Sequence, residues 1–71
     1  MTITQAEVIT QLAKNNMNTS AVAKSMFMHR NTIYHHIYQI QRKTGLNPLS
    51  FYDLCELLRR ATAVLEGDHD N

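Results

Sequence analysis

Hydrophobic residues recur at steps of three and four along most of the chain, and no stretch alternates apolar and polar residues as a strand does. Only two Gly and one Pro interrupt this pattern. The pattern predicts an all-α domain of four helices that contains a helix-turn-helix. We expect the helices to span residues 5–15, 19–27, 30–44 and 51–66. They would form one domain, residues 1–66, followed by a polar C-terminal tail, residues 67–71.

The first two helices have recognisable N-terminal ends. Thr4 and Glu7 have the spacing of a capping box for the first helix, and Asn18 is a favourable N-cap for the second. The asparagines near residue 16 are typical of a turn between them. The second helix is expected to point four residues towards the core, namely Val22, Ala23, Met26 and Phe27.

The third and fourth helices also carry end signals. Gly45 suits the left-handed position after the third helix, where Leu46 can pack back on the last turn. Ser50 and Asp53 have the spacing of a second capping box, which predicts where the fourth helix begins. Both boundaries follow from local chemistry alone.

The helix over residues 51–66 is apolar on more than one side, which predicts two partners for it. Leu57 and Val64 lie to one side and are expected to contact a second subunit in a homodimer. Cys55 is expected to be a small buried residue, and as the only cysteine it excludes a disulfide within the chain. The residues expected to fill the domain core are Leu54, Leu58, Ala61 and Leu65.

A short helix, a tight turn and a longer helix define a helix-turn-helix, and residues 19–44 have this layout. Ala23 is a small residue at the position where the second helix of the motif would pack closest to the first. Ile33 and Ile37 lie at the positions of the second helix that would pack against the first. Phe27 stands in the turn where many such motifs carry Gly. The spacing therefore predicts that the helix over residues 30–44 is the recognition helix.

Charge is unevenly distributed although the net charge is only +1. No Asp or Glu occurs between Val8 and Tyr52, an interval that holds five Lys and Arg residues, whereas five of the six acids follow Tyr52. A basic half of this kind attracts phosphate. The chain has no stretch that could span a membrane and no signal-peptide pattern, so we expect a cytoplasmic, nucleoid-associated protein.

The stretch MFMHRNTIYHHIYQIQRKTGL, followed by LSFYDLCELLRRA, resembles the C-terminal helix-turn-helix domain of the PucR and CdaR (sugar diacid regulator) transcription factors. His29-Arg30-Asn31-Thr32 matches the start of that family's recognition helix, and Thr44-Gly45-Leu46 matches its end. The chain is also similar to Fis-type DNA-binding domains. The resemblance, which covers about residues 7–65, implies a bacterial transcription regulator. The chain departs from the family at Tyr34 and His36, where arginines are common.

With isoleucines facing the core, the opposite face of the recognition helix fits the major groove of duplex DNA. Arg30 is suited to guanine and Asn31 to adenine, and tyrosine and histidine offer hydrogen bonds and contacts with thymine methyl groups. The residues expected to contact bases are Arg30, Asn31, Tyr34, His35 and Tyr38. Those expected to contact phosphates are His29, Thr32, Lys24, Arg42 and Lys43.

Other functions have less support in the sequence. His35 and His36 point about 100° apart on a helix, and no metal-ligand spacing joins them to His29 or Cys55, so we expect no metal site. No nucleophile motif or phosphate-binding loop indicates an enzyme, a cofactor or a small-molecule ligand. The alternative is a protein-interaction module that uses the aromatic and histidine face of the third helix or the two-sided fourth helix.

Overall fold

The computed structural model describes residues 1–67 and shows four helices and no strand in that range. They are α1 (Ile3–Lys14), α2 (Thr19–Ser25), α3 (Arg30–Thr44) and α4 (Phe51–Glu66). The all-α fold is confirmed, and α3 and α4 have the predicted bounds. Residues 68–71 of the predicted polar tail lie outside the described part of the chain. None of these helices is both long and apolar enough to cross a membrane.

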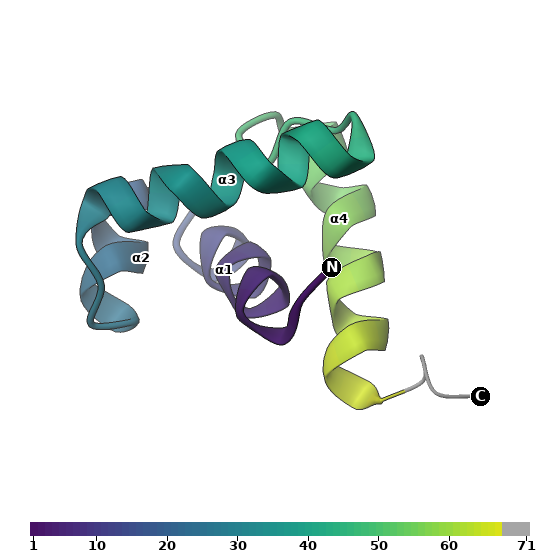
Figure 1. Ribbon diagram of the computed structural model, residues 1–71, viewed down its shortest axis with the longest axis horizontal. Coiled ribbons are helices and arrows are strands. Elements are labelled where there is room, and N and C mark those ends of the chain that lie inside the picture. The colour runs from purple at the N-terminus through teal and green to yellow at the C-terminus, as the bar shows by residue number, and fades with distance from the viewer. Residues whose placement is uncertain (68–71) are drawn as a thin grey trace.

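α1 is the central helix of the fold (Figure 1). It packs against each of the other three helices, α2 and α3 pack against each other, and α4 packs against α1. This position explains why α1 is buried on more than one side. Fully burying an Ile or Leu side chain stabilises a fold by about 1.5–3 kcal/mol, so α1 is a main source of core stability. Its fully buried apolar residues are Ala6, Val8, Ile9 and Leu12.

The prediction that the first helix starts after Thr4 is wrong by two residues. The capping box is formed by Thr2 and Gln5: the Thr2 hydroxyl accepts a hydrogen bond from the Gln5 N–H at 3.0 Å, and the Thr2 N–H donates to Gln5 Oε1 at 3.1 Å. Both pairs have capping-box spacing. The earlier start adds Ile3 and Thr4 to the helix, so that the buried Gln5 lies in its first turn instead of at its end.

Phe27 does not face the core, contrary to the prediction. α2 ends at Ser25, and Phe27 takes a left-handed backbone conformation with a φ of 55°. This conformation reverses the chain between α2 and α3 and points the ring outwards, so that 96% of Phe27 is exposed. Met26 and Met28 pack partly against the core on either side of it.

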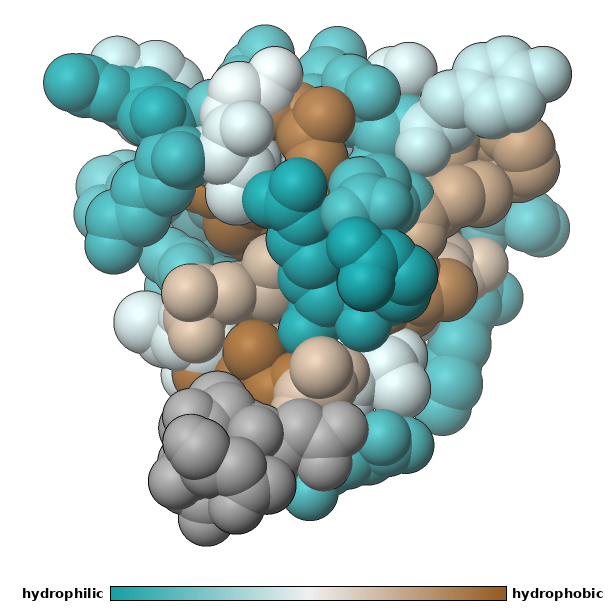
Figure 2. Space-filling view, turned by 90° about the vertical axis from the view of Figure 1, so that its right-hand side faces the viewer, coloured by the Kyte–Doolittle hydropathy of each residue, from teal (hydrophilic) through white to brown (hydrophobic). Residues whose placement is uncertain are grey.

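α4 turns a different line of residues towards α1 than the one predicted. Leu57 is fully buried, so it is not available to contact a second subunit, whereas Leu65 is 42% exposed. Cys55 is exposed rather than buried. Figure 2 looks onto the α4 side of the molecule, where hydrophobic residues lie on both sides of a hydrophilic cluster. The observed inward line and the predicted one share two residues, and their mean directions differ by about 50° of rotation about the helix axis. The observed line is Leu54, Leu57, Ala61 and the partly buried Val64.

The predicted capping box at the start of α4 is also wrong. Ser50 is the N-cap residue, but its side chain makes no capping hydrogen bond. Asp53 instead accepts a hydrogen bond from the backbone N–H of Asn47 at 2.9 Å. The carboxylate therefore closes the loop around the buried Pro48, which fixes the path from α3 to α4.

Candidate nucleic-acid interface

α3 is held by a continuous apolar line and by caps at both ends. Ile33, Ile37 and Ile40 are at most 5% exposed and face the core. At the N-terminal end, Nδ1 of His29 accepts a hydrogen bond from the backbone N–H of Asn31 at 3.0 Å. At the other end, Gly45 has a φ of 75°, the left-handed conformation that glycine adopts without strain. The opposite side of α3 therefore faces solvent at a fixed angle.

α2 and α3 form a helix-turn-helix. The turn is fixed by a hydrogen bond from the Met28 N–H to the Ala23 carbonyl at 2.9 Å. Ala23 is only 6% exposed, which allows the close approach of the two helices that the sequence predicts. Phe27 adopts the backbone conformation that Gly supplies more readily at this place.

Every residue expected to contact DNA is exposed on the helix-turn-helix. Tyr34 and Tyr38 are 45% and 56% exposed, so neither is part of the core. α2 contributes one of these residues, and the rest lie on α3 or directly before it. The set comprises Lys24, His29, Arg30, Asn31, Thr32, Tyr34, His35, Tyr38, Arg42 and Lys43.

Two hydroxyl groups at the start of α2 orient side chains of α3. The hydroxyls of Thr19 and Tyr34 are hydrogen-bonded at 3.0 Å. One nitrogen of the Arg30 guanidinium donates to the Ser20 hydroxyl at 3.4 Å. Thr19 and Ser20 were not among the residues predicted from the sequence, although adjacent hydroxyl residues at the start of the first helix of the motif are a signal that could have identified them.

The C-terminal half of α3 has its own side-chain contact. One nitrogen of the Arg42 guanidinium donates to the Tyr38 hydroxyl at 3.4 Å, and the guanidinium carbon lies 5.8 Å from the ring centroid. Such a cation–π contact limits the freedom of both side chains. The surface here is hollowed by a shallow depression of 410 Å³, lined by His35, Tyr38, Gln39, Arg42 and Lys43.

His36 lies at the edge of this face and is half-buried. Its Nδ1 atom is buried and has no hydrogen-bond partner among residues 1–67. His36 therefore packs at the flank of α3 and does not belong to its fully exposed face.

Electrostatics distinguish α3 from α4. The Arg59 guanidinium, followed by that of Arg60, donates hydrogen bonds to Glu56, and together they hold the pKa of the Glu56 carboxyl below its ordinary value. Both cations of α4 are thus paired with a carboxylate of the same helix. Within residues 1–67, the cations of α2 and α3 form no ion pair, and neither helix contains an acidic residue. An approaching phosphate therefore meets unbalanced positive charge at α3.

No group of three potential metal ligands is assembled anywhere in residues 1–67. His35 and His36 are neighbours, with ring centroids 6.3 Å apart, but their rings diverge by 53°. The chemistry that this surface offers is hydrogen bonding, ring contact and positive charge.

A four-helix domain whose second and third helices form this motif, with an unbalanced basic face on the third, is a helix-turn-helix protein of the DNA-binding class. The family model of the PucR C-terminal helix-turn-helix domain matches residues 5–64. The chain belongs to this family, and so to the DNA-binding domains of transcription regulators. No curated protein and no solved structure matched it.

Proposed function

We propose that this chain binds duplex DNA in a sequence-dependent manner, as a bacterial transcription regulator or the DNA-binding domain of one, with α3 in the major groove. The observation that carries this proposal is the exposed face of α3, which presents arginine, asparagine, tyrosine and histidine and contains no carboxylate. The composition of the whole chain gives little support for DNA binding, because the net charge is only +1. Such a protein acts in the cytoplasm, at the nucleoid.

Base recognition is assigned to the exposed face of α3 between Arg30 and Tyr38. Arg30 can donate two hydrogen bonds to guanine, and Asn31 can pair with the donor and acceptor of adenine. Tyr34, His35 and Tyr38 offer hydrogen bonds and contacts with thymine methyl groups. The bond between Tyr34 and Thr19 supports this assignment, since a held side chain loses less entropy on binding.

Phosphate contacts are assigned to residues around this face. His29 and Thr32 lie at the N-terminal end of α3, where the helix dipole favours an anion. Lys24 on α2, together with Arg42 and Lys43 in the last turn of α3, extends the positive charge to both flanks. These contacts position the protein without reading sequence.

The small number of cations favours binding by two copies. A single copy making few phosphate contacts binds weakly at physiological salt. Two copies on half-sites about 34 Å apart, one turn of DNA, combine their contacts. A homodimer is therefore part of the proposal, although Leu57, which is buried, does not form its interface.

The test is a fluorescence-anisotropy titration of the protein onto a labelled mixed-sequence duplex at several salt concentrations. We expect the logarithm of the binding constant to fall linearly with the logarithm of salt concentration, and selection from random duplexes to give a preferred site. Failure to bind even at low salt would overturn the proposal. That result would favour the alternative function, in which the exposed faces of α3 or α4 bind a protein.

A further inference from the structure

Three large apolar side chains are exposed together where α3 leads into α4. Leu49, Phe51 and Tyr52, which we call the aromatic corner, are 40%, 62% and 83% exposed. The rings of Phe51 and Tyr52 pack edge to face, with centroids 5.5 Å apart. None of these residues belongs to the proposed DNA-reading face. A cluster of exposed large apolar side chains in a chain of 71 residues marks a contact surface.

A groove of 240 Å³ lies beside the aromatic corner, between α1 and α4. Asn16 is a polar residue of its lining, and no charged side chain lines it. Phe51 belongs to both features, so the projecting rings and the groove are continuous. The apolar side chains that line the groove include Leu12, Met17, Phe51, Leu54, Cys55 and Leu58.

We propose that the aromatic corner contacts a second copy of this chain, with Tyr52 of each copy lying against the groove of the other. A two-fold contact uses the same surface twice, so that surface must be complementary to itself. A projecting ring directly beside an apolar groove meets this condition. The uncharged lining of the groove also means that the two-fold arrangement brings no like charges together at its centre.

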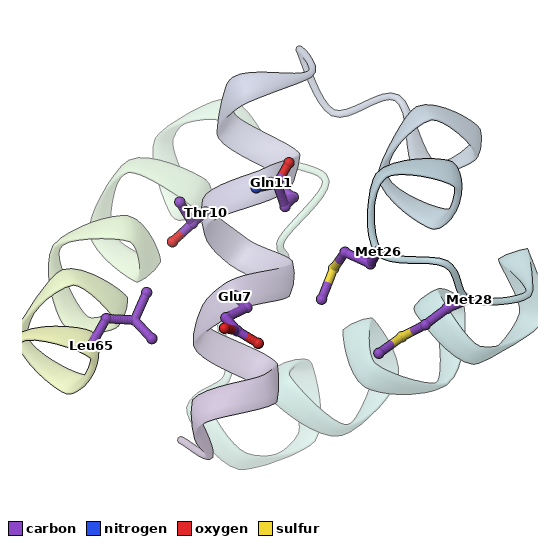
Figure 3. A pocket seen from close by; sticks show the side chains of 6 residues that line it. All are labelled: Glu7, Thr10, Gln11, Met26, Met28 and Leu65. Carbon is purple, nitrogen blue, oxygen red and sulfur yellow. The ribbon is translucent and has the colours of Figure 1, made fainter.

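A second candidate surface for a two-fold contact is a depression that we call the methionine groove (Figure 3). It is not complementary to itself. It has a volume of 420 Å³ and is lined by Glu7, Thr10 and Gln11 of α1 and by Met26, Met28 and Leu65. A two-fold contact here would bring two Glu7 carboxylates together. The C-terminal ends of α2 and α4 lie on the side of α1 opposite to α3, so this contact would also point the two recognition helices away from each other (Figure 1).

The size of the aromatic corner predicts a weak dimer. Phe51 and Tyr52 each leave roughly 100–200 Å² of surface exposed, whereas a stable interface buries about 800 Å² on each partner. We therefore expect the contact to form mainly when two copies occupy adjacent half-sites, where their effective concentration is high. This part of the inference rests on the proposed function. The contact at the aromatic corner itself does not.

Cys55 gives a direct test, because it lines the groove and is the only cysteine in the chain. The protein is treated with a short bis-maleimide at rising concentration, with and without a duplex of about 30 base pairs. We expect covalent dimer to increase with protein concentration and to increase further on the duplex. Tyr52→Asp should lower the yield at least tenfold. The matched control is Phe27→Asp, which changes the most exposed aromatic ring outside the aromatic corner and should leave the yield without duplex unchanged.

Two further measurements keep the result interpretable. Circular dichroism establishes that both variants are folded, and labelling with a single maleimide establishes that Cys55 reacts equally in both. No covalent dimer under any condition would overturn the inference, as would a loss in Phe27→Asp with full yield in Tyr52→Asp. The proposed function is judged separately: wild-type protein that cross-links through Cys55 but does not bind DNA would overturn the function and leave the interface standing.

Discussion

The hydroxyl of Thr19, the first residue of α2, is hydrogen-bonded to the hydroxyl of Tyr34 in α3 at a distance of 3.0 Å. The bond joins the two helices of the helix-turn-helix on their exposed side, opposite the isoleucines that join them in the core. It fixes the direction of the Tyr34 ring across the face of α3. Tyr34 is therefore presented to a partner in one orientation rather than several.

This bond predicts an energetic coupling between the two residues. We expect Thr19→Val and Tyr34→Phe each to weaken binding to a selected duplex, and the double variant to be no weaker than the worse single variant. The coupling should be roughly 0.5–1.5 kcal/mol, the net value of one hydrogen bond. Anisotropy titrations of the four proteins measure it. Tyr38→Phe is the matched control, because the Tyr38 hydroxyl is bonded to Arg42 and its effect should simply add to that of Thr19→Val.

Arg30 should determine base preference. Its guanidinium is exposed at the start of α3 and oriented by Ser20. Arg30→Ala is expected to cost about 1–3 kcal/mol on the selected duplex and to relax the preference at one base position. Arg59→Ala is the control, since Arg59 is engaged with Glu56 on α4 and should change binding little. Site selection with each variant makes the comparison. An equal loss on all sequences would assign Arg30 to a phosphate instead.

The core beneath α3 should dominate stability. Ile33 is fully buried where α3 packs, so Ile33→Ala should lower the free energy of unfolding by about 2–5 kcal/mol. Ile3 has the same side chain but is 61% exposed, and Ile3→Ala should have a much smaller effect. Urea denaturation followed by circular dichroism measures both. Equal losses in the two variants would contradict the packing described for α3.

Glu56 should contribute to stability only while its carboxyl is ionised. Hydrogen bonds from Arg59 and then Arg60 lower the pKa of Glu56 from its ordinary value of 4.5 in the folded protein. A lowered pKa in the folded state means that the contribution is fully present above pH 4.5 and is lost as the pH falls through the folded-state pKa. Glu56→Gln should therefore unfold at a lower temperature than wild type at pH 7. The difference between the two proteins should shrink progressively as the pH falls below 4.5, and the contribution at pH 7 should be small because the groups are exposed.

A difference between wild type and Glu56→Gln that does not shrink as the pH falls below 4.5 would indicate a role for Glu56 other than its ion pairs. Thr62→Val is a useful comparison, because the Thr62 hydroxyl lies on the exposed side of the same helix and donates to the Leu58 carbonyl, a contact with no ionisable group. Its effect on the unfolding temperature should not change over the same pH range.

Local chemistry in the sequence determined the helices and the exposed face of α3. Gly45 acts at the end of α3 itself, and the isoleucine spacing identifies the buried side of the helix, so these features were predicted without knowledge of any other helix. The exposure of Arg30, Asn31 and Tyr34 followed directly, because residues opposite a buried line face solvent.

Only the tertiary structure decided which side of α4 is buried, and how α2 meets α3. Leu57 and Leu58 are both suited to a core. The packing of α1 against α4 buries Leu57 and leaves Cys55 exposed. The turn places Phe27 in solvent because its backbone is left-handed. The bond between Thr19 and Tyr34 spans fifteen residues. Such features depend on relations between helices, and helical periodicity within one segment does not specify them.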